Sequence, residues 1–348
     1  MRILIATTMV PFIRGGAEMM VEGLAEKLRE RGHDVDVASL PFKWYPPEKI
    51  ADHMLACRLL DVTESCGETI DRVISIKFPA YLVSHPHKVL WLAHQHRAVY
   101  DGWVAGTSEL LQEPLGKQTR DLVRAADANI LAEARKIYTI SKTVSSRLRS
   151  FCGMESESLY HPPPNADRFR KGSYGHYFLV PGRITGSKRQ KLVMEAVKKA
   201  TAPVRVCFIG PAEGPRGAAE FQRLIDTSGA SDRVSWIGNL SEDRKVEAYA
   251  ECRAVIFPPF EEDYGYITLE AMLAEKAVIT CTDSAGPLEF VRDRETGLIC
   301  APSADALAEA MDDLWNNPLR AEAFGRSGRK AYDDADISWD KAISCLLA

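Results

Sequence analysis

Short apolar segments alternate with amphipathic helical segments along almost the whole chain of 348 residues. This alternation is typical of parallel strands joined by crossover helices. In the first half, the apolar runs predict strands at 2–7, 34–40, 72–78, 88–93 and 136–141. In the second half, they predict strands at 176–182, 204–210, 233–238, 254–259, 277–281 and 297–300. The sequence therefore predicts an α/β fold with two doubly wound sheets in tandem.

The segment between the first two predicted strands has the pattern of a crossover helix. Its apolar residues lie on one stripe, at positions 17, 20, 21, 24, 25 and 28, and Gly32 follows as a stop signal. Strand, helix and strand together predict a βαβ unit at the start of the chain.

A proline-rich segment at 161–175 separates the two series of strands. It combines three consecutive prolines with turn formers and basic residues and has no periodicity, as expected of a domain boundary. The length of the chain also suits two domains. We expect a first domain at 1–165, a second at 166–335 and a final helical segment at 336–348.

The composition is that of a soluble globular protein, with 46% hydrophobic and 26% charged residues. A net charge of -4 does not indicate a nucleic-acid partner. The eight cysteines are scattered without zinc or redox spacing, so we interpret them as small core residues in a reducing cytoplasm. The apolar N-terminal stretch is too short for a signal peptide, and no window reaches the roughly 20 apolar residues of a membrane span. Any membrane contact is then expected at the surface.

One stretch of the first half is strongly basic. Residues 117–149 contain eight Lys or Arg against three Asp or Glu. Two interpretations remain open at this point: a solvated helical face, or a patch that meets anionic lipid or an anionic acceptor.

The segment FEEDYGYITLEAM (260–272) carries two carboxylates, Glu262 and Glu270, around Gly265. It directly follows a predicted strand, and ligands of open α/β sheets bind beyond the carboxyl ends of strands. The free amides of Gly265, Tyr266 and Ile267 at a helix start would suit a phosphate. The two carboxylates would then accept hydrogen bonds from hydroxyl groups, one on a sugar ring and one on a ribose.

This segment resembles the E-x7-E motif of the GT4 family of retaining glycosyltransferases, which have the GT-B fold. The resemblance implies two Rossmann-like domains facing each other across a cleft, the first for the acceptor and the second for the donor, with the last helix crossing back to the first. It implies that Glu262 contacts donor-sugar hydroxyls and supports positive charge, and that Glu270 holds the ribose. Asp263 and Tyr264 belong to the same donor-binding loop.

The segment VPGRITGSK (180–188) resembles the family's GR-x4-K signature, which assigns Arg183 and Lys188 to the departing diphosphate. Either a metal or fixed cations must stabilise the two phosphate charges that develop there. We therefore expect no metal and no cofactor other than the donor substrate.

Three further segments match the family in order. Gly15 and Gly16 resemble its GG loop, where backbone approaches the diphosphate. His94 is the better match to the strand-end histidine that reaches the donor sugar, with His96 as the alternative. The loop of Gly238, Asn239 and Leu240 corresponds to the place where the family packs the nucleobase.

The chain departs from the family's usual pattern at several positions. Where the family usually has E-G-F-G, this chain has Asp263 and Tyr264 between Glu262 and Gly265. Arg189 follows Lys188 where glycine is usual, and Ala285 and Gly286 stand where two glycines are frequent. The D-x-D at 34–36 mimics a metal motif of a different glycosyltransferase fold. Its alternation with valines indicates the polar face of a strand near a sheet edge instead.

The resemblance predicts a metal-independent retaining hexosyltransferase that uses GDP-mannose or a UDP-hexose. The expected acceptor is a glycan, glycolipid or small molecule in cell-surface polysaccharide, lipopolysaccharide or glycolipid synthesis. The expected location is cytoplasmic, with possible peripheral contact at the inner face of the membrane. A catalytically silent nucleotide-sugar-binding module and a sugar phosphorylase of similar architecture are the alternatives. A dehydrogenase is disfavoured because no G-x-G-x-x-G follows a strand.

Overall fold

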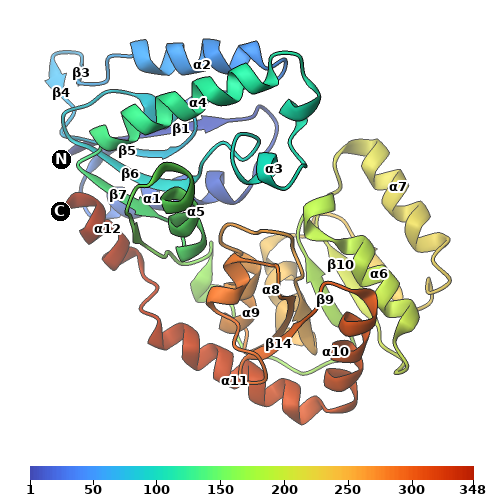
Figure 1. Ribbon diagram of the computed structural model, residues 1–348. Coiled ribbons are helices and arrows are strands. Elements are labelled where there is room, and N and C mark those ends of the chain that lie inside the picture. Colours follow the sequence, from blue (N-terminus) through green and yellow to red (C-terminus); the bar gives the residue numbers. More distant parts are fainter. The chain divides into compact units, whose positions relative to one another are not determined.

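The computed structural model describes all 348 residues, and they form two compact units (Figure 1). The first unit contains Met1–Pro164 and also Ser338–Ala348, while the second contains Asn165–Ile337. Each unit has its own six-stranded parallel sheet. The predicted fold class of two Rossmann-like halves is confirmed.

The sheet of the first unit has the order β2-β1-β5-β6-β7-β8. Its strands are β1 (Arg2–Met9), β2 (Asp34–Pro41), β5 (Arg72–Lys77), β6 (Lys88–His94), β7 (Lys136–Thr139) and β8 (Glu157–Ser158). Because the order reverses between β1 and β5, the loops that leave these two strands diverge at their carboxyl ends. This is the switch point of the first unit.

Helices pack around this sheet. They are α1 (Gly16–Glu30), α2 (Glu48–Leu59), α3 (Asp101–Val104), α4 (Gly116–Ile130), α5 (Lys142–Cys152) and α12 (Trp339–Leu347), with 3₁₀ turns at Ala80–Leu82, Glu109–Gln112 and Leu131–Glu133. The predicted stripe of α1 is buried at Met20, Val21, Leu24, Ala25 and Leu28. Gly32 follows the helix at φ 79°, the left-handed conformation that suits glycine after a helix end.

The D-x-D at 34–36 lies on an edge strand, as its alternation predicts. β2 is the outermost strand, and Asp34 and Asp36 are exposed on either side of buried Val35. Asp34 accepts a hydrogen bond from Arg2 at 3.2 Å, and Asp36 accepts one from the Val37 amide at 2.8 Å. Both carboxylates are therefore used in local contacts of the strand.

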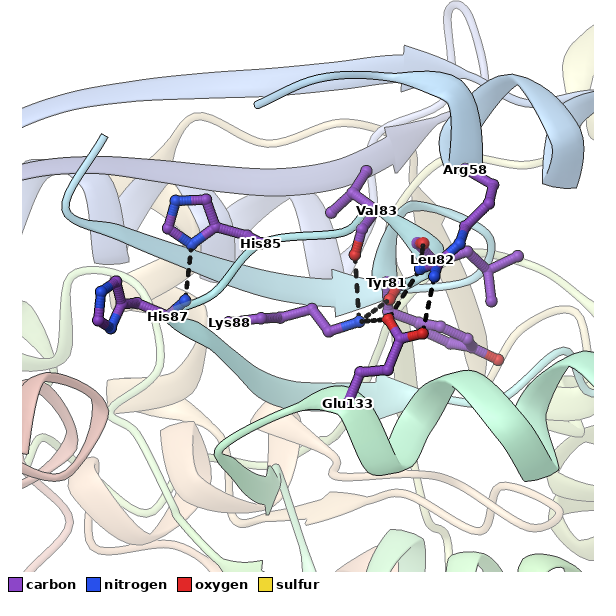
Figure 2. Close-up of polar contacts among 8 residues, drawn as sticks. All are labelled: Arg58, Tyr81, Leu82, Val83, His85, His87, Lys88 and Glu133. Atoms are coloured by element: carbon purple, nitrogen blue, oxygen red, sulfur yellow. Dashed lines mark hydrogen bonds and ion pairs between the residues drawn. The ribbon is translucent and has the colours of Figure 1, made fainter. Parts of the chain in front are cut away.

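A buried lysine ties the loops at the amino end of this sheet together (Figure 2). The Lys88 ammonium donates to the carbonyls of Val83 and Tyr81 at 3.1 and 3.3 Å and lies 3.5 Å from Glu133. Glu133 also receives two hydrogen bonds of 2.7 Å from Arg58 at the end of α2. Burial lowers the pKa of Lys88, and the Glu133 carboxylate opposes that shift. The network joins α2, the turn after β5 and the end of α4.

The last helix, α12, packs in the first unit, beside α1. The indole of Trp339 lies against Gly23, where an added Cβ would come within 2.8 Å of the ring. Two further hydrogen bonds hold the helix: Tyr138 donates to the Cys345 carbonyl at 3.2 Å, and Arg72 donates to the Leu346 carbonyl at 2.7 Å. The end of the chain is thus part of the first core.

The sheet of the second unit has the order β11-β10-β9-β12-β13-β14. Its strands are β9 (Phe178–Pro181), β10 (Val206–Ile209), β11 (Val234–Ile237), β12 (Ala254–Ile256), β13 (Ala277–Cys281) and β14 (Gly297–Cys300). Its helices are α6 (Gln190–Lys199), α7 (Gly214–Asp226), α8 (Glu242–Glu251), α9 (Tyr266–Leu273), α10 (Ala304–Asn316) and α11 (Pro318–Asp334), with 3₁₀ turns at Ala166–Arg168, Gly186–Lys188 and Gly286–Glu289. The order reverses between β9 and β12, which pair directly and form the switch point here.

Some sequence-based expectations of local structure were wrong. The hairpin of β3 (Glu64–Ser65) and β4 (Glu68–Thr69) and the short β8 were not predicted, because two-residue strands leave no periodicity. Cys66 is exposed in the turn of that hairpin, so it is not a core residue. Cys57, Cys252 and Cys281 are buried as expected. No helix has the length and apolar character needed to cross a membrane.

Candidate active site

The loops at the switch point of the second unit carry the predicted cations and the first predicted carboxylate. Residues 183–189 follow β9 and residues 257–265 follow β12. Because β9 and β12 are adjacent and parallel, both loops leave the same edge of the sheet. Backbone also joins them, since the Phe260 amide donates to the Ser187 carbonyl at 2.8 Å.

Lys188 and Glu262 form an ion pair at this edge. The side chains are 19% and 23% exposed, so the pair is shielded but still reachable from solvent. The Lys188 ammonium also lies 5.2 Å from the centre of the Phe257 ring. Partial desolvation strengthens both contacts, which leaves the ammonium and the carboxylate in defined positions.

Arg183 lies in the same loop with an exposed side chain. Its backbone is held by the buried Gln190, whose amide nitrogen donates to the Arg183 carbonyl at 2.9 Å. The side-chain oxygen of Gln190 accepts a hydrogen bond from the Thr185 backbone amide at 3.3 Å. The loop is therefore braced from inside while the guanidinium remains available to a ligand.

Gly265 allows α9 to begin at this edge. It has φ 87°, and an added Cβ would lie 3.2 Å from Phe257 and 3.3 Å from Pro287. No side chain caps the start of the helix. The amino end of α9, with Tyr266 and Ile267 in its first turn, therefore points its amides and the positive end of the helix dipole toward the site.

The residues around Gly265 pack as an aromatic cluster. The Tyr264 ring lies 5.5 Å from the ring of Tyr266 and 5.8 Å from that of Phe290. Burial raises the pKa of the Tyr266 hydroxyl, with a further contribution from the nearby Glu270 carboxylate. Asp263, which stands between Glu262 and Tyr264 in the sequence, is half-buried. These contacts hold the turn from which α9 starts.

Glu270 is 3% exposed and already has two partners. Lys245 donates to one carboxylate oxygen and Tyr249 to the other, both at 2.6 Å. Burial would lower the pKa of Lys245, but the Glu270 carboxylate raises it overall. Lys245 and Tyr249 were not predicted as site residues. Their spacing of four places them on one face of α8, but the sequence does not show that this face meets α9.

The loop after β11 lies beside the loops after β9 and β10. The Gly210 amide donates to the Gly238 carbonyl at 2.9 Å, and a Cβ at Gly210 would lie 2.3 Å from the Gly182 carbonyl. Asn239 is exposed, while Leu240 is half-buried. Glycines after three neighbouring strands thus let these loops approach closely.

In the first unit, Gly15 and Gly16 lie at the start of α1, after β1. Glu18 accepts the Gly15 amide at 2.9 Å and also pairs with Lys77, which ends β5. Sequence reasoning missed Glu18 and Lys77. The Glu18–Lys77 ion pair therefore links α1, the helix after β1, to the end of β5 at the switch point of the first unit.

The two histidines at the end of β6, His94 and His96, have different surroundings. His94 is aligned with Lys77 in the sheet, and its Nδ1 lies 2.8 Å from the Gln95 carbonyl. Because a carbonyl only accepts, Nδ1 carries the hydrogen, and Nε2 of the neutral ring is an acceptor. His96 stacks on Phe78 at 5.0 Å with its Nε2 buried and unpaired. Burial lowers the pKa of His96 to about 4.

The second unit therefore brings Arg183, Lys188, Glu262 and the start of α9 to one edge, with Glu270 buried one turn further along that helix. Gly15, Gly16 and His94 share the carboxyl edge of the other sheet. No three side chains of His, Cys, Asp or Glu lie close enough together to hold a metal ion.

Comparison with known proteins identifies the family. The family described as "Glycosyl transferases group 1" matches residues 165–331. The chain is also 32% identical to the alpha-1,3/1,6-mannosyltransferase ALG2 of Dictyostelium discoideum, over 75% of this chain and 70% of that protein. The chain belongs to the group 1 glycosyltransferases.

Two other matches extend over nearly the whole of this group 1 glycosyltransferase. The O-antigen chain mannosyltransferase C of Escherichia coli is 24% identical over 96% of this chain and 94% of its own. Among solved structures, the sucrose-phosphate synthase from Thermosynechococcus elongatus superposes with a TM-score of 0.79 at 19% identity, covering 99% of this chain and 98% of that one. The likeness confirms the predicted GT-B fold.

Proposed function

We propose that this group 1 glycosyltransferase moves a hexose from a nucleoside diphosphate sugar to an acceptor hydroxyl, with retention and without a bound metal. The observation that carries the proposal is the Lys188–Glu262 pair at the switch point of the second unit. A cation and a carboxylate held at one strand edge, beside an uncapped helix start, suit a sugar joined to a diphosphate.

In this proposal the diphosphate is bound by Arg183, Lys188 and the first amides of α9. The backbone of the Arg183 loop and the Lys188 ammonium are held before the donor arrives, because Gln190 braces the loop and Phe257 packs against the ammonium. As the bond to the sugar breaks, negative charge grows on the leaving phosphate. Cations and amides already in place stabilise that charge without rearrangement.

Glu262 is proposed to contact donor-sugar hydroxyls and to support the positive charge on the sugar ring. In the free chain its carboxylate is paired with Lys188, so each side chain keeps the other oriented. The acceptor hydroxyl attacks the anomeric carbon on the face from which the diphosphate leaves. Its proton passes to the departing phosphate oxygen, and the configuration is retained.

Glu270 and the loop of Gly238, Asn239 and Leu240 are proposed to bind the nucleoside. Lys245 and Tyr249 each donate to one Glu270 oxygen, and each oxygen can accept a second hydrogen bond. The ribose hydroxyls are proposed to donate these second bonds. The pair with Lys245 also holds the buried carboxylate in one orientation. Asp263 and Tyr264 are proposed to shape the same donor site.

The first unit is proposed to take the acceptor, and three residues at the carboxyl edge of its own sheet are proposed as donor contacts. Gly15 and Gly16 present backbone, while His94 presents Nε2, the ring nitrogen that is not bonded to the Gln95 carbonyl, to a sugar hydroxyl. The Glu18–Lys77 pair holds the Gly15 amide in place.

The proposed donor is GDP-mannose or a UDP-hexose, and the proposed acceptor is a glycan, glycolipid or small molecule of cell-surface glycan synthesis. The E. coli and Dictyostelium relatives are mannosyltransferases by name, which favours mannose as the first sugar to test. The E. coli relative acts on an O-antigen chain by name, which favours a glycan acceptor. We place the enzyme in the cytoplasm, with peripheral contact at the inner face of the membrane.

The decisive experiment measures thermal stabilisation by GDP-mannose, UDP-glucose, UDP-galactose and the free nucleotides. A donor present at 100 times its Kd should stabilise the folded chain by about 2.7 kcal/mol, which raises the melting temperature. Turnover with the best donor is then measured in excess EDTA. We expect binding to survive Glu262→Gln and turnover to fall, since that variant keeps the shape but loses the charge.

Three outcomes would contradict the proposal. Stabilisation by no nucleotide would remove the donor site, and binding without transfer to any acceptor would indicate a silent module. Activity abolished by EDTA and restored by magnesium would refute the role of Arg183 and Lys188 as the cations that replace a metal.

A further inference from the structure

Arg189 occupies a backbone conformation that an arginine rarely adopts. Its φ is 54°, in the left-handed region, at the N-cap of α6 and directly after Lys188. Side chains with a Cβ are strained there, whereas glycine is not. The chain therefore keeps an arginine where the backbone favours glycine, so the side chain needs an explanation of its own.

The Arg189 guanidinium makes a two-pronged ion pair with Asp283. Its two terminal nitrogens donate to the two carboxylate oxygens at 2.7 and 2.6 Å, which is the strongest geometry for such a pair. The guanidinium also lies 5.0 Å from the centre of the Phe260 ring. Arg189 follows β9, Phe260 follows β12 and Asp283 follows β13, so one side chain touches three loops of the candidate site.

Backbone hydrogen bonds connect two of these loops, those after β12 and β13, next to Glu262. The Glu261 amide donates to the Asp283 carbonyl at 3.1 Å, and the Glu262 amide donates to the Ser284 carbonyl at 3.2 Å. Arg189, the residue after Lys188, adds a side-chain link between the loop after β9 and the loop after β13. Rotation of the loop that carries Lys188 would break both guanidinium contacts.

We propose that Arg189 is a positioning residue: its pair with Asp283 fixes the loop after β9 so that the Lys188 ammonium stays where the leaving phosphate develops charge. The inference rests on the proposed function and adds to it the pair of Arg189 and Asp283. It explains why a strained arginine is kept, because glycine would relax the backbone and release the loop.

A role in stability alone predicts a different result. The two side chains are 20% and 30% exposed, and partly exposed ion pairs contribute little to folding. Backbone strain at Arg189 also opposes that small gain. Arg189→Gly should therefore leave the melting temperature unchanged or slightly raised, while turnover falls.

The test compares Arg189→Gly with Arg294→Gly, using whichever of GDP-mannose and UDP-glucose supports transfer by the unaltered protein. Arg294 is a matched control, since it is an arginine of the same unit at φ 59°, exposed and paired only loosely with Asp293 at 3.7 Å. Both variants relax the same strain. We expect kcat to fall about tenfold to a hundredfold in Arg189→Gly, the range for a displaced catalytic group, and to stay unchanged in Arg294→Gly.

Donor-induced thermal stabilisation separates positioning from binding. It should fall much less than kcat in Arg189→Gly, because the Lys188 contact is needed most when charge accumulates in the transition state. Asp283→Asn should reproduce the loss of kcat, and the double variant should be no worse than either single one. Guanidinium ions added to Arg189→Gly should restore part of the turnover.

Unchanged kcat in Arg189→Gly would overturn the inference, as would equal losses in Arg189→Gly and Arg294→Gly. Additive losses in the double variant would show that the two side chains act separately, and would also overturn it. Failure of the unaltered protein to transfer any sugar would instead refute the proposed function. The two failures are therefore distinguishable in one series of assays.

Discussion

Glu270 is a buried carboxylate that is satisfied before any ligand binds, by Lys245 and Tyr249. Glu270→Ala should abolish nucleotide-dependent stabilisation and also lower the free energy of unfolding by about 2 kcal/mol, because it leaves Lys245 partly buried without a partner. Chemical unfolding with and without the best nucleotide measures both effects.

The control for Glu270→Ala is Lys245→Met, which breaks the same pair from the other side. It should cost comparable stability but retain nucleotide binding, since Glu270 and Tyr249 remain. Normal nucleotide affinity in Glu270→Ala would refute the ribose assignment.

His96 makes the stability of the first unit depend on pH. Its folded pKa of about 4 lies below the usual 6.5, so the unfolded chain binds the proton first as pH falls. Stability should therefore decrease from about pH 6.5 toward pH 4, by about 2 kcal/mol between pH 7 and pH 5. His96→Phe keeps the stack on Phe78 and should remove this part of the slope. Urea unfolding at both pH values tests it, and an identical slope in the variant would contradict the assignment.

Turnover of His96→Phe also separates the roles of the two histidines at the end of β6. If His94 is the donor contact, the variant should keep its activity at pH 7. A large loss without a change in stability would move the role to His96.

At the scale of elements, the start of α9 depends on Gly265. Gly265→Ala adds a methyl group that would crowd Phe257 and Pro287, and it also forces a left-handed alanine. We expect a loss of stability of about 2 kcal/mol, together with weaker donor binding, because the first amides of α9 would shift. Gly229→Ala is the control: it has φ 71° with nothing within 4 Å, so it adds backbone strain alone. Equal effects of the two variants on donor binding would argue against an anion site at α9.

The basic stretch at 117–149 is less available to a partner than its composition suggests. Most of its cations make contacts within the chain, among them Arg120 with Val99 and Trp103, Arg135 with Pro86, Lys136 with Tyr138, Arg147 with Asp101, and Arg149 with Glu155. On α4, Lys117 and Arg124 are exposed together with Leu122, and Leu115 is exposed at its start. Any lipid contact is therefore expected at α4.

Neutralising Lys117 and Arg124 to Gln should reduce binding to vesicles rich in anionic lipid by about tenfold or more, since each cation near such a surface contributes about 1 kcal/mol. Co-sedimentation at low and high salt measures the change. Arg216→Gln with Arg223→Gln on exposed positions of α7 removes the same charge elsewhere and should have little effect. An equal loss in both pairs would indicate a non-specific charge effect.

At the scale of the whole molecule, the chain enters the second unit once and returns to the first through α12. Trp339 contacts Trp91 and His161 at ring distances of 6.2 and 5.6 Å, so the returning helix and the segment leaving the first unit share one aromatic cluster. Trp339→Ala should therefore destabilise the first unit by about 2 kcal/mol and leave the second unchanged.

Hydrogen exchange resolved by segment tests this expectation for Trp339→Ala. Protection should fall in β1, β5, β6 and α1, and the core of the second unit should exchange at its original rate. Leu319→Ala in α11 is the control, because that side chain is 78% exposed. Loss of protection spread evenly over both units would show that they unfold as one.

Much of the architecture was accessible from local patterns. Apolar runs located every long strand, because a strand covered on both faces must be apolar along its length. The two motifs placed Arg183, Lys188 and Glu262 at strand ends, since chain order alone shows which residues follow a strand. Strand ends were less accurate: the run at 176–182 was predicted two residues too long at its start, because side-chain pattern does not show where pairing begins.

Contacts between distant segments could not be derived in the same way. Lys188 meets Glu262 across 74 positions only because β9 and β12 are neighbours in the sheet. Lys245 reaches Glu270, and Arg189 reaches Asp283, for the same kind of reason. Spacing along the chain determines which face of its own helix or strand a side chain occupies. That information is sufficient to predict the fold class and the kinds of chemical group in the candidate site. Which element that face meets follows from burying all the apolar faces of a unit at once, and that condition is satisfied only by the folded chain.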